Sequence, residues 1–363
     1  MRRSSDKKIF IGTMSGTSHD GIDICSLKVT NQISLLKFGS FKYPRQLRED
    51  ISRAIQRQEL SLNMYFELNK RIGYAFSKSI EKFLTQNKIN KKSIGAIGLS
   101  GQTLFHQPKG RYPFSIQAGD PRIIAKECGV DVIGDFRNDH IKLGGEGAPL
   151  VPEFHQKLFA KKNVPLVILN IGGISNFTYL DGKNDFYGSD CGPGNALMDC
   201  YCQNFLNRPF DRNGKHAKNG AIHFPSLNQM LSHPFFKRRH PKSTGKEIFN
   251  IRFIPKQLLK RSPQDALATL TELTALCIAK SLLSLKQSPQ EVIVCGGGLR
   301  NNFLIHSIER HINMNLTSSD QYGVNPQAIE AMAFGWMARQ RIYKNPLIVK
   351  KNKGMLGTLT KAR

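Results

Sequence analysis

Hydrophobic and polar positions along the chain follow a pattern that predicts two halves with the same beginning. A short apolar run at 8–12 leads through a polar, glycine-containing turn into a second run at 24–29. The same order recurs as an apolar run at 166–170, a glycine turn at 171–176 and a further run at 177–180. Two hairpins of one pattern predict two related lobes, each offering one glycine turn to a shared ligand.

The spacing of apolar residues predicts the remaining elements. Helices are expected at 51–84, 196–205, 266–285, 301–311 and 327–341. Short strands are expected at 94–99, 131–134 and 291–295. Alternating strands and helices are typical of the α/β class. The expected domains are an N-terminal lobe at 1–140, a C-terminal lobe at 141–343 and a basic tail at 344–363 that forms a loose end.

Length and composition agree with a two-domain globular protein. The chain has 363 residues, 40% of them hydrophobic and 9% aromatic, which is more than one ordinary core needs. The seven cysteines are odd in number and scattered, which argues against a disulfide framework and for a reducing compartment. The basic first residues are followed by no export signal, and the longest apolar stretch identified, 164–171, is far shorter than a membrane helix. We therefore expect a soluble, cytoplasmic protein with no membrane partner.

The net charge of +26 is unusually high for a soluble enzyme. The basic residues are spread along the chain, and no aromatic residues interleave with their small clusters as a stacking platform would require. We therefore expect no specific nucleic-acid partner. An anionic substrate and a generally basic proteome are the two remaining explanations.

The first glycine turn is a candidate phosphate and metal site. Hydroxyls, glycines and two carboxylates are concentrated directly after the first strand, in a pattern that suits backbone amides facing phosphate oxygens. The alternative is a hairpin turn with ordinary Asx chemistry. Asp20 and Asp23 are the candidate Mg²⁺ ligands. The candidate nucleotide contacts are Gly16, Thr17, Ser18, His19, Asp20, Gly21, Ile22 and Asp23.

Two further glycine turns favour a nucleotide. Gly172 and Gly173 would let the backbone approach a phosphate closely. Gly296, Gly297 and Gly298 follow a strand and precede a helix, where they suit an adenosine or a ribose. Glycine is also needed wherever packing is tight, and that alternative stays open.

Two acids are candidate general bases. Asp190 lies in a rigid Gly/Pro turn that enters a helix, so its carboxylate has a controlled direction. Its alternative role is to cap that helix. Asp135 and Arg137 are expected at a strand end, on the same side of an extended chain. Arg137 then binds a substrate carboxylate or forms a structural ion pair.

Ten motifs run in order from about residue 9 to residue 340, nearly the whole chain. The first six are Met14-Ser15-Gly16-Thr17-Ser18-x-Asp20-Gly21-x-Asp23, Gly101-Gln102-Thr103-x-x-His106, Gln117-x-Gly119-Asp120, Asp135-Phe136-Arg137, 147–152 and Asn170-Ile171-Gly172-Gly173-Ile174-Ser175-Asn176. The other four are Asp190-x-Gly192-Pro193-Gly194-Asn195, 242–247, Cys295-Gly296-Gly297-Gly298 and 330–334. Taken together, these motifs resemble one enzyme family, that of the anhydro-N-acetylmuramic acid kinases.

The resemblance implies a fold and a reaction. The implied fold is the two-lobed, actin-like ATPase (ribonuclease H-like) α/β fold, with a cleft between lobes that close on ATP and Mg²⁺. In the implied reaction, water opens the 1,6-anhydro ring of the sugar as its O6 takes the γ-phosphoryl group, which gives N-acetylmuramic acid 6-phosphate in peptidoglycan recycling. A kinase of the same fold acting on another sugar or acid is the alternative.

The same resemblance implies roles for individual residues. Asp190 is the first choice for the base that activates water, and Asp135 is the second. Arg137, Gln102, Asn195 and Glu330 are the expected substrate-binding residues, and a homodimer is the expected assembly. The sequence departs from the family at His140, where aspartate is common, and at His19, where an apolar residue is usual.

Overall fold

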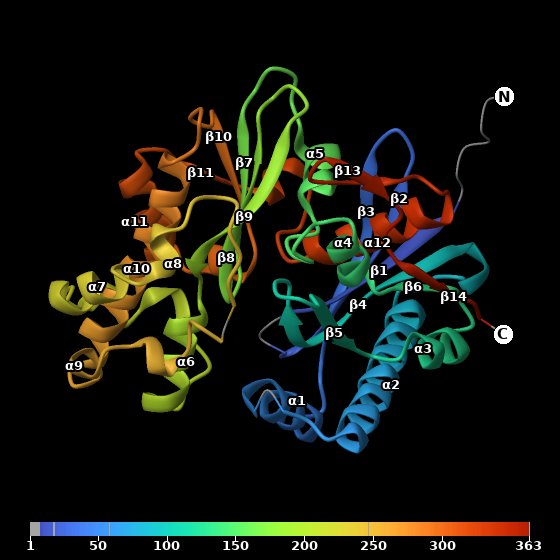
Figure 1. Cartoon of the computed structure of the whole chain (residues 1–363), viewed down its shortest axis with the longest axis horizontal. Coiled ribbons are helices and arrows are strands. Elements are labelled where there is room, and N and C mark those ends of the chain that lie inside the picture. The colour runs from blue at the N-terminus through green and yellow to red at the C-terminus, as the bar shows by residue number, and fades with distance from the viewer. Residues whose placement is uncertain (1–7, 17–18, 58, 246, 363) are drawn as a thin grey trace. The chain divides into compact units, whose positions relative to one another are not determined.

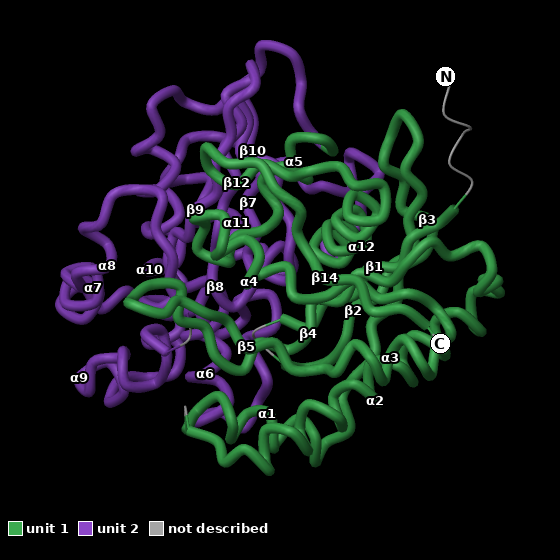
Figure 2. The backbone as a smooth tube through the Cα atoms, turned by 45° about the vertical axis from the view of Figure 1, so that its right-hand side comes forward, with its two compact units in different colours: residues 1–158, 328–363 green, residues 159–327 purple. Residues whose placement is uncertain are grey.

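The computed structural model describes residues 8–16, 19–57, 59–245 and 247–362. It divides the chain into unit 1, residues 1–158 and 328–363, and unit 2, residues 159–327 (Figure 2). The sequence placed the division at 140 and kept the last long helix in the second lobe. That helix, α12 (Ile329–Ile342), instead packs on the sheet of unit 1, so the chain returns to its first unit after residue 327.

Unit 1 is built on a mixed β-sheet. Its strands are β1 (Ile9–Ser15), β2 (Gly21–Val29), β3 (Ile33–Lys42), β4 (Ile94–Gln107), β5 (Phe114–Ala118), β6 (Val132–Gly134) and β14 (Thr358–Thr360). The order is β14-β6-β4-β1-β2-β3, and β5 pairs with β4 (Figure 1). β1, β4 and β6 are parallel, whereas β2 is antiparallel to both of its neighbours. A separate hairpin joins β12 (Leu347–Val349) to β13 (Asn352–Gly354).

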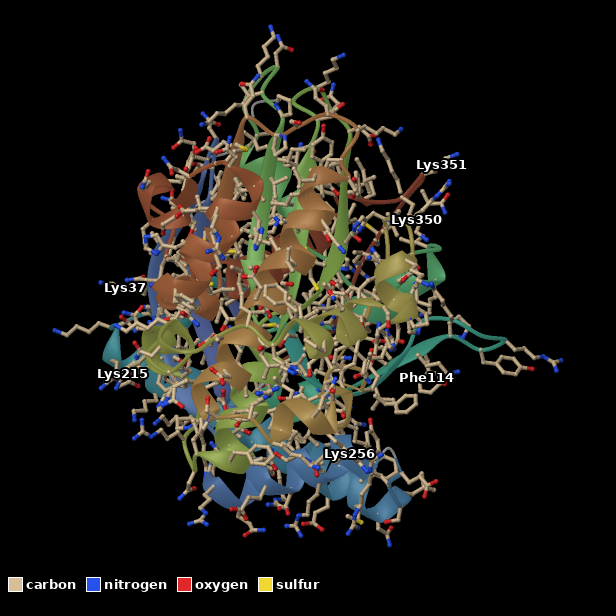
Figure 3. All side chains as sticks on the ribbon, turned by 90° about the vertical axis from the view of Figure 1, so that its left-hand side faces the viewer. Lys37, Phe114, Lys215, Lys256, Lys350 and Lys351 are labelled. Carbon is tan, nitrogen blue, oxygen red and sulfur yellow. The ribbon has the colours of Figure 1, made fainter. Side chains whose placement is uncertain are left out.

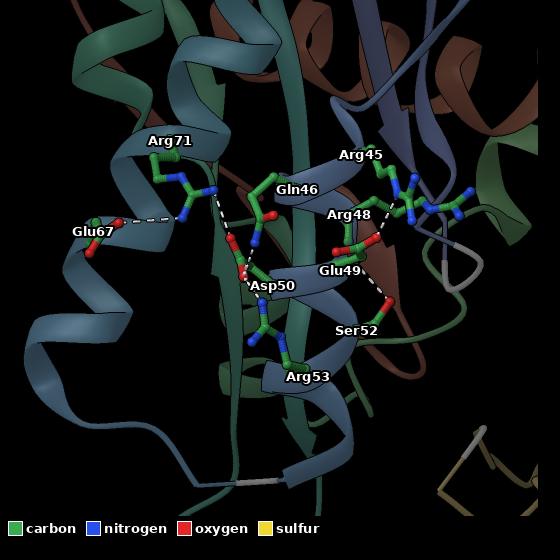
Figure 4. Close-up of polar contacts among 9 residues, drawn as sticks. All are labelled: Arg45, Gln46, Arg48, Glu49, Asp50, Ser52, Arg53, Glu67 and Arg71. Atoms are coloured by element: carbon green, nitrogen blue, oxygen red, sulfur yellow. Dashed lines mark hydrogen bonds and ion pairs between the residues drawn. The ribbon is translucent and has the colours of Figure 1, made fainter.

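The helical segment expected at 51–84 consists of two helices. The helices in the first part of the chain are α1 (Arg45–Arg57), α2 (Leu62–Gln86), α3 (Pro121–Cys128), α4 (Phe136–Lys142) and α5 (Pro152–Phe159). Ser61 begins α2 by accepting a hydrogen bond from the backbone N–H of Met64. Asp50 of α1 accepts hydrogen bonds from Arg53 and from Arg71 of α2, and so links the two helices (Figure 4).

Unit 2 repeats the topology of unit 1. Its strands are β7 (Leu166–Ile171), β8 (Ile174–Leu180), β9 (Phe186–Pro193), β10 (Glu291–Cys295) and β11 (Leu316–Ser318). The order β11-β10-β7-β8-β9 matches β6-β4-β1-β2-β3, and the parallel and antiparallel pairings correspond strand by strand. The prediction of two related α/β halves is confirmed, although β3 and β9, the third strand of each repeat, were not predicted.

The described part of unit 2 also contains α-helices. They are α6 (Ala196–Phe205), α7 (Phe224–Leu231), α8 (Pro234–Lys237), α9 (Lys256–Leu259), α10 (Pro263–Leu283) and α11 (Asn302–Ile312). By length and composition α10 is a candidate membrane span, which was not predicted from the sequence. However, 83% of its most apolar 18-residue stretch is buried within the protein, and the helix packs against α6, α7, α11 and β9. α10 is therefore the central core helix of unit 2.

Each unit has a hydrophobic core of its own. In unit 1 the core side chains come mainly from β2, β4, α1, α2 and α3, and in unit 2 mainly from β7, α6, α10 and α11. The seven cysteines are free thiols, and all but Cys200 are buried, which confirms the prediction that no disulfide framework is present. Two separate cores are what a chain of this length was expected to form.

Three glycines let α12 lie directly on the sheet of unit 1. A methyl group on Gly12 of β1 would overlap the carbonyl oxygen of Ala331, and one on Gly98 of β4 would overlap that of Phe334. Gly335 of α12 faces β1, and a methyl group on Gly335 would lie 3.1 Å from the backbone nitrogen of Gly12. Backbone therefore meets backbone at this contact, and any side chain would separate helix from sheet.

The basic C-terminal residues are not the loose end that the sequence suggested. β14 pairs antiparallel with β6 at the sheet edge. The N–H of Gly357 donates to Asp139 Oδ2 at 2.9 Å, and Arg341 Nε donates to the carbonyl of Gly357 at 2.7 Å. The segment is ordered because the edge strand β6 supplies backbone partners that sequence periodicity does not reveal.

Much of the excess positive charge lies on side chains that reach into solvent. Lys37, Lys215, Lys256, Lys350 and Lys351 are exposed and extend away from the ribbon (Figure 3). Solvated charges of this kind are compatible with many folds. Most of the net charge therefore needs no binding partner to explain it.

The protein is expected to lose stability in mild acid, because four of its histidines are buried or half-buried. Loss of water lowers the pKa of His155 to about 3 and those of His106, His140 and His240 to about 4. In the unfolded chain a histidine titrates near about 6.5, so below that pH the unfolded state binds protons that the folded state does not. The free energy of unfolding is expected to fall by about 1.4 kcal/mol per pH unit for each histidine below that value.

Urea unfolding at a series of pH values between neutrality and mild acid measures this slope. His155→Leu is expected to reduce the slope of the unfolding free energy against pH by the contribution of one proton. A matched substitution of the exposed His306 is the control. Carboxylates contribute equally to both curves, so the difference between variant and wild type isolates the imidazole. An unchanged slope in His155→Leu would contradict the prediction.

Candidate active site

The first glycine turn joins β1 to β2. The N–H of His19 donates to the carbonyl of Gly16 at 3.0 Å, and His19 adopts a positive φ of 45°. Its imidazole lies 2.7 Å from Ser52 Oγ of α1. Asp20 is exposed, and its carboxylate lies 4.0 Å from Arg48. The predicted contacts Thr17 and Ser18 lie outside the described residues.

A buried hydrogen-bond network fixes the start of this turn. Ser15 Oγ donates to Gln102 Oε1 at 2.7 Å and accepts a hydrogen bond from the Tyr43 hydroxyl at 3.0 Å. Gln102 Nε2 donates to the carbonyl of Gly16 at 3.4 Å and to that of Thr103 at 3.3 Å. Gln102 is fully buried, and both ends of its amide have partners within the protein. Its side chain therefore supports the turn, and Tyr43 does so without having been predicted.

The last residues of the first glycine turn, 21–23, belong to β2 and pair with β3. Ile22 is 1% exposed and belongs to the unit 1 core, so its side chain is unavailable to a ligand. A methyl group on Gly21 would overlap the carbonyl of Phe41 in β3, which explains the glycine by packing. Asp23 is half-buried on β2, and burial raises the pKa of its carboxyl group although Ser40 donates a hydrogen bond to it.

Three charged groups from separate segments interact in unit 1. The pKa of Glu330, at the start of α12, is raised chiefly by burial, lowered by the positive charge of Arg137 and raised further by Asp23. Arg137 donates from Nη1 to the carbonyl of Gly147 at 2.8 Å. Its buried Nε has no hydrogen-bond partner among the described residues. An enclosed guanidinium N–H of this kind offers a place for an anionic oxygen.

His140, where the sequence departs from the family, holds the neighbouring loop. Its Nδ1 accepts a hydrogen bond from the backbone N–H of Gly147 at 2.9 Å. The carbonyl of the same Gly147 is the acceptor for Arg137. His140 thus fixes the loop that positions the guanidinium, and its low pKa keeps it a neutral acceptor above about pH 4.

The expectation that Asp135 and Arg137 share one side of an extended chain is wrong. β6 ends at Gly134, Asp135 adopts a left-handed conformation with φ of 59°, and Phe136 begins α4. Asp135 accepts a hydrogen bond from Asn138 Nδ2 and lines a cavity of about 260 Å³ that also contains Tyr65 and Ser115. Arg137 does not line that cavity. Partial removal from water raises the pKa of the Asp135 carboxyl group.

Asn195 locks the second glycine turn. The backbone N–H of Asn195 donates to the carbonyl of Gly172 at 2.8 Å, and its Nδ2 donates to the same oxygen at 3.1 Å. The carbonyl of Gly173 accepts from the N–H groups of Gly194 and Ala196. The start of α6 is therefore bound to the turn, and the side chain of Asn195 positions Gly172 and Gly173.

The three glycines after β10 have different roles. A methyl group on Gly296, whose φ is +86°, would overlap Asn170 Oδ1, and one on Gly298 would overlap the side chain of Ile171. Both glycines are explained by tight packing against the end of β7. Gly297 is exposed and has nothing within 4 Å of the position of a Cβ atom. Only this position of the three leaves open space for a ligand.

Asp190 is a buried acid of unit 2 that main-chain hydrogen bonds hold in place. It lies on β9 with 8% of its surface exposed. The N–H of Thr244 donates to its Oδ2 at 2.8 Å, and its own N–H donates to the carbonyl of Lys242 at 2.9 Å. The segment 242–244 thus fixes the carboxylate from outside the sheet. The alternative that Asp190 caps α6 is not adopted, because the N-terminal position of that helix is Asn195.

Among the described residues, the predicted site residues form one group within unit 1 and another within unit 2. In unit 1 the first turn, Gln102, Arg137 and Glu330 belong to one connected network, whereas Asp135 lines a separate cavity. In unit 2 the second turn and Asn195 are joined. Within the described part of the chain no group of three or more metal-ligating side chains is present.

Two units of one topology, each with a glycine turn between its first two strands, define the actin-like, ribonuclease H-like class of α/β proteins. The chain matches the family model for anhydro-N-acetylmuramic acid kinase over residues 8–360. A protein of that name from Gamma-proteobacterium EBAC31A08 is 46% identical over 98% of this chain and 99% of its own, and one from Vibrio vulnificus (strain YJ016) is 37% identical over 94% of each. This chain belongs to the anhydro-N-acetylmuramic acid kinase family.

Among solved structures, an activator of 2-hydroxyisocaproyl-CoA dehydratase from Clostridium difficile with bound ADPNP is similar over 93% of this chain and 96% of its own. The identity is 13% and the TM-score is 0.49.

Proposed function

We propose that this protein is an ATP-dependent kinase for 1,6-anhydro-N-acetylmuramic acid. It opens the 1,6-anhydro ring with water and phosphorylates O6 to give N-acetylmuramic acid 6-phosphate, a step of cell-wall recycling. The family match over residues 8–360 is the observation that carries this proposal. A same-fold kinase for another sugar or acid is the alternative that the experiment below separates.

Asp190 is our choice for the general base. The carboxylate takes a proton from water as the water oxygen forms a bond to C1 and the C1–O6 bond breaks. O6 then forms a bond to the γ-phosphorus, and the bond from that phosphorus to the bridging oxygen of ADP breaks. The hydrogen bond from the N–H of Thr244 supports this role, because it fixes the direction of the carboxylate. Asp135, with its raised pKa, is the second candidate.

The glycine turns are our candidates for nucleotide binding. We assign the phosphates to the backbone amides of the first turn and to Gly172 and Gly173, and the nucleoside to open Gly297. Asp20 and Asp23 fit Mg²⁺, which is usually held by one or two carboxylates together with substrate phosphates. When bound there, Mg²⁺ neutralises charge that develops on the transferred phosphoryl group.

Arg137 and Glu330 are our candidates for direct sugar contacts. The unpartnered Nε of Arg137 matches the lactyl carboxylate of the sugar, and Glu330 beside it matches a sugar hydroxyl. Gln102 and Asn195 are reassigned as positioning residues, because their amides already bind the two glycine turns. A cytoplasmic location, a homodimer and a cleft between the lobes stay predictions.

The deciding experiment measures ADP release with Mg-ATP and each of three sugars in ¹⁸O-labelled water. Turnover is expected with 1,6-anhydro-N-acetylmuramic acid and with neither N-acetylmuramic acid nor N-acetylglucosamine, and the label is expected at C1. Turnover on an intact hexose would favour the alternative kinase. ATP hydrolysis without dependence on sugar would reject the proposed reaction and leave the fold intact.

A further inference from the structure

Unit 2 contains a large cavity that none of the predicted site residues lines. It has a volume of about 870 Å³ and lies between the β8–β9 hairpin, the segment 236–242 and the second half of α10. Tyr179, Tyr187 and Phe236 contribute aromatic surface to its wall. This volume suits a ligand of the size of a sugar phosphate or a nucleotide.

The cavity is strongly cationic. Five of its lining residues are basic, namely Arg238, Arg239, Lys242, Lys280 and Lys286. The two acidic lining residues, Asp181 and Asp185, already accept hydrogen bonds from backbone N–H groups of the β8–β9 turn. Among the described residues, none of the five basic side chains forms an ion pair with a carboxylate. The five cations outnumber the two carboxylates of the lining, so an anionic ligand would meet a net positive wall.

Lys242 is the buried member of this set. It is 5% exposed, and its Nζ donates one hydrogen bond, to the carbonyl of Phe235 at 3.3 Å. Nζ also lies 4.5 Å from the centroid of the Phe235 ring. Within the described part of the chain this ammonium group, which has three donors, has no other hydrogen-bond acceptor. Burial lowers the pKa of Lys242, although the negative charge of Asp190 acts in the opposite direction.

The backbone around Lys242 also holds Asp190. The N–H of Lys242 donates to Ser189 Oγ at 2.9 Å, and its carbonyl accepts from the N–H of Asp190 at 2.9 Å. Two residues later, the N–H of Thr244 donates to the Asp190 carboxylate. One short segment therefore forms a wall of the cavity with the side chain of Lys242 and fixes Asp190 with its main chain.

We propose that this cavity is a second binding site, which takes a phosphate monoester carried on a ring-shaped organic body. Lys242 is the buried anchor for the phosphate, Arg238 and Lys280 complete its charge, and the aromatic wall contacts the ring. A phosphate monoester carries nearly two negative charges and three acceptor oxygens, which matches several separate cations better than one carboxylate does. Binding at this site does not depend on the proposed kinase reaction.

Binding is measured by calorimetric titration of the full-length protein with glucose 6-phosphate, AMP and inorganic phosphate. We expect at least one of the two esters to bind more tightly than inorganic phosphate, and the tighter ester identifies the sugar-phosphate or the nucleotide as the source. Equal affinity for inorganic phosphate would overturn the role of the aromatic wall. Absence of saturable binding by both esters would overturn the site.

Lys242→Met is the decisive variant, because it keeps the length of the side chain and removes the charge. We expect it to weaken ester binding about tenfold or more. Without ligand it is expected to be at least as stable as wild type in thermal unfolding, since a buried ammonium group with no ion pair among the described residues is replaced by an apolar group. Lower stability with undiminished ester binding would show a structural lysine and overturn the proposal.

A second pair of variants separates this site from the active site. Lys280→Gln, at the exposed rim, is expected to weaken ester binding about threefold, because it removes one partly screened charge. Asp190→Asn is expected to bind the ester as wild type does, even if catalysis is lost. Loss of binding in Asp190→Asn but not in Lys242→Met would place the ester in the active site and overturn the proposal.

Binding of the ester in this cavity is also expected to lower kcat of the wild-type enzyme. A ligand that binds the Lys242 side chain displaces the backbone of the same segment, and that backbone holds the Asp190 carboxylate in position. This consequence rests on the proposed function, and the binding measurement does not. The ester should leave kcat unchanged in Lys242→Met. An ester that binds wild type without any effect on kcat would overturn the coupling to Asp190.

Discussion

Asp190→Asn is expected to lower kcat by about 10²- to 10⁴-fold while the protein stays folded, because the substitution removes the group that accepts a proton from water. Asparagine has nearly the same shape, and its carbonyl oxygen can still accept the hydrogen bond that the N–H of Thr244 donates. The measurement is steady-state release of ADP with 1,6-anhydro-N-acetylmuramic acid. Unchanged ATP affinity would show that the loss lies in chemistry rather than in nucleotide binding.

Asp135→Asn is the matched control for this prediction. Asp135 is also an acid with a protein hydrogen-bond partner, but it lines a cavity of unit 1, whereas Asp190 belongs to unit 2. If Asp190 is the base, Asp135→Asn is expected to keep most of kcat. The reverse result, with Asp135→Asn inactive and Asp190→Asn active, would assign the base to Asp135. A pH profile of kcat that loses its acidic limb in only one variant would identify the same residue independently.

The repeated topology and the glycine turns could be predicted because their signals are local. Each hairpin is a short apolar run, a dense group of glycines and polar residues, and a second apolar run, and this order is visible in any window of the sequence. The helices α6, α10 and α11 were likewise predicted within a few residues by apolar spacing. Identification of the family depended on ten such local motifs in order.

The domain division could not be predicted because it depends on contacts far apart in the chain. α12 returns to unit 1 because Gly12 and Gly98 leave room for its backbone, and neither glycine belongs to a recognisable helix-binding pattern. The tail is ordered by an edge strand about 220 residues earlier, with Thr358 paired to Gly134. Periodicity describes one element at a time and contains no information about such pairings.

The hydrogen-bond partners of the candidate site residues could not be predicted from residue type. Gln102 and Asn195 were expected to contact sugar, yet their amides bind the two glycine turns. Gly296 and Gly298 were grouped with Gly297, although only Gly297 leaves space. A polar side chain near a ligand and a polar side chain that supports the ligand's loop have the same sequence signature. Only the hydrogen-bond partners distinguish them.

Gly12→Ala is expected to lower the free energy of unfolding by about 3 kcal/mol or more, because overpacking against rigid backbone cannot be relieved by rotating a side chain. The added methyl group would overlap the carbonyl of Ala331 and lie 2.7 Å from the backbone nitrogen of Gly335. Either β1 or α12 must then move. Urea unfolding of the variant beside wild type measures the loss.

Gly134→Ala is the matched control, since Gly134 is also a buried strand glycine of unit 1. Its methyl group would meet only the side chain of Leu99, at 3.8 Å, which is ordinary contact. A change within about 1 kcal/mol is expected there. Equal unfolding free energies of the two variants would show that α12 can move away from Gly12 at little cost, and would contradict the prediction. If α12 is instead held as closely as the glycines indicate, Gly12→Ala should also displace Glu330, the neighbour of Ala331. Turnover by the fraction of the variant that stays folded is then expected to be lower than that of wild type.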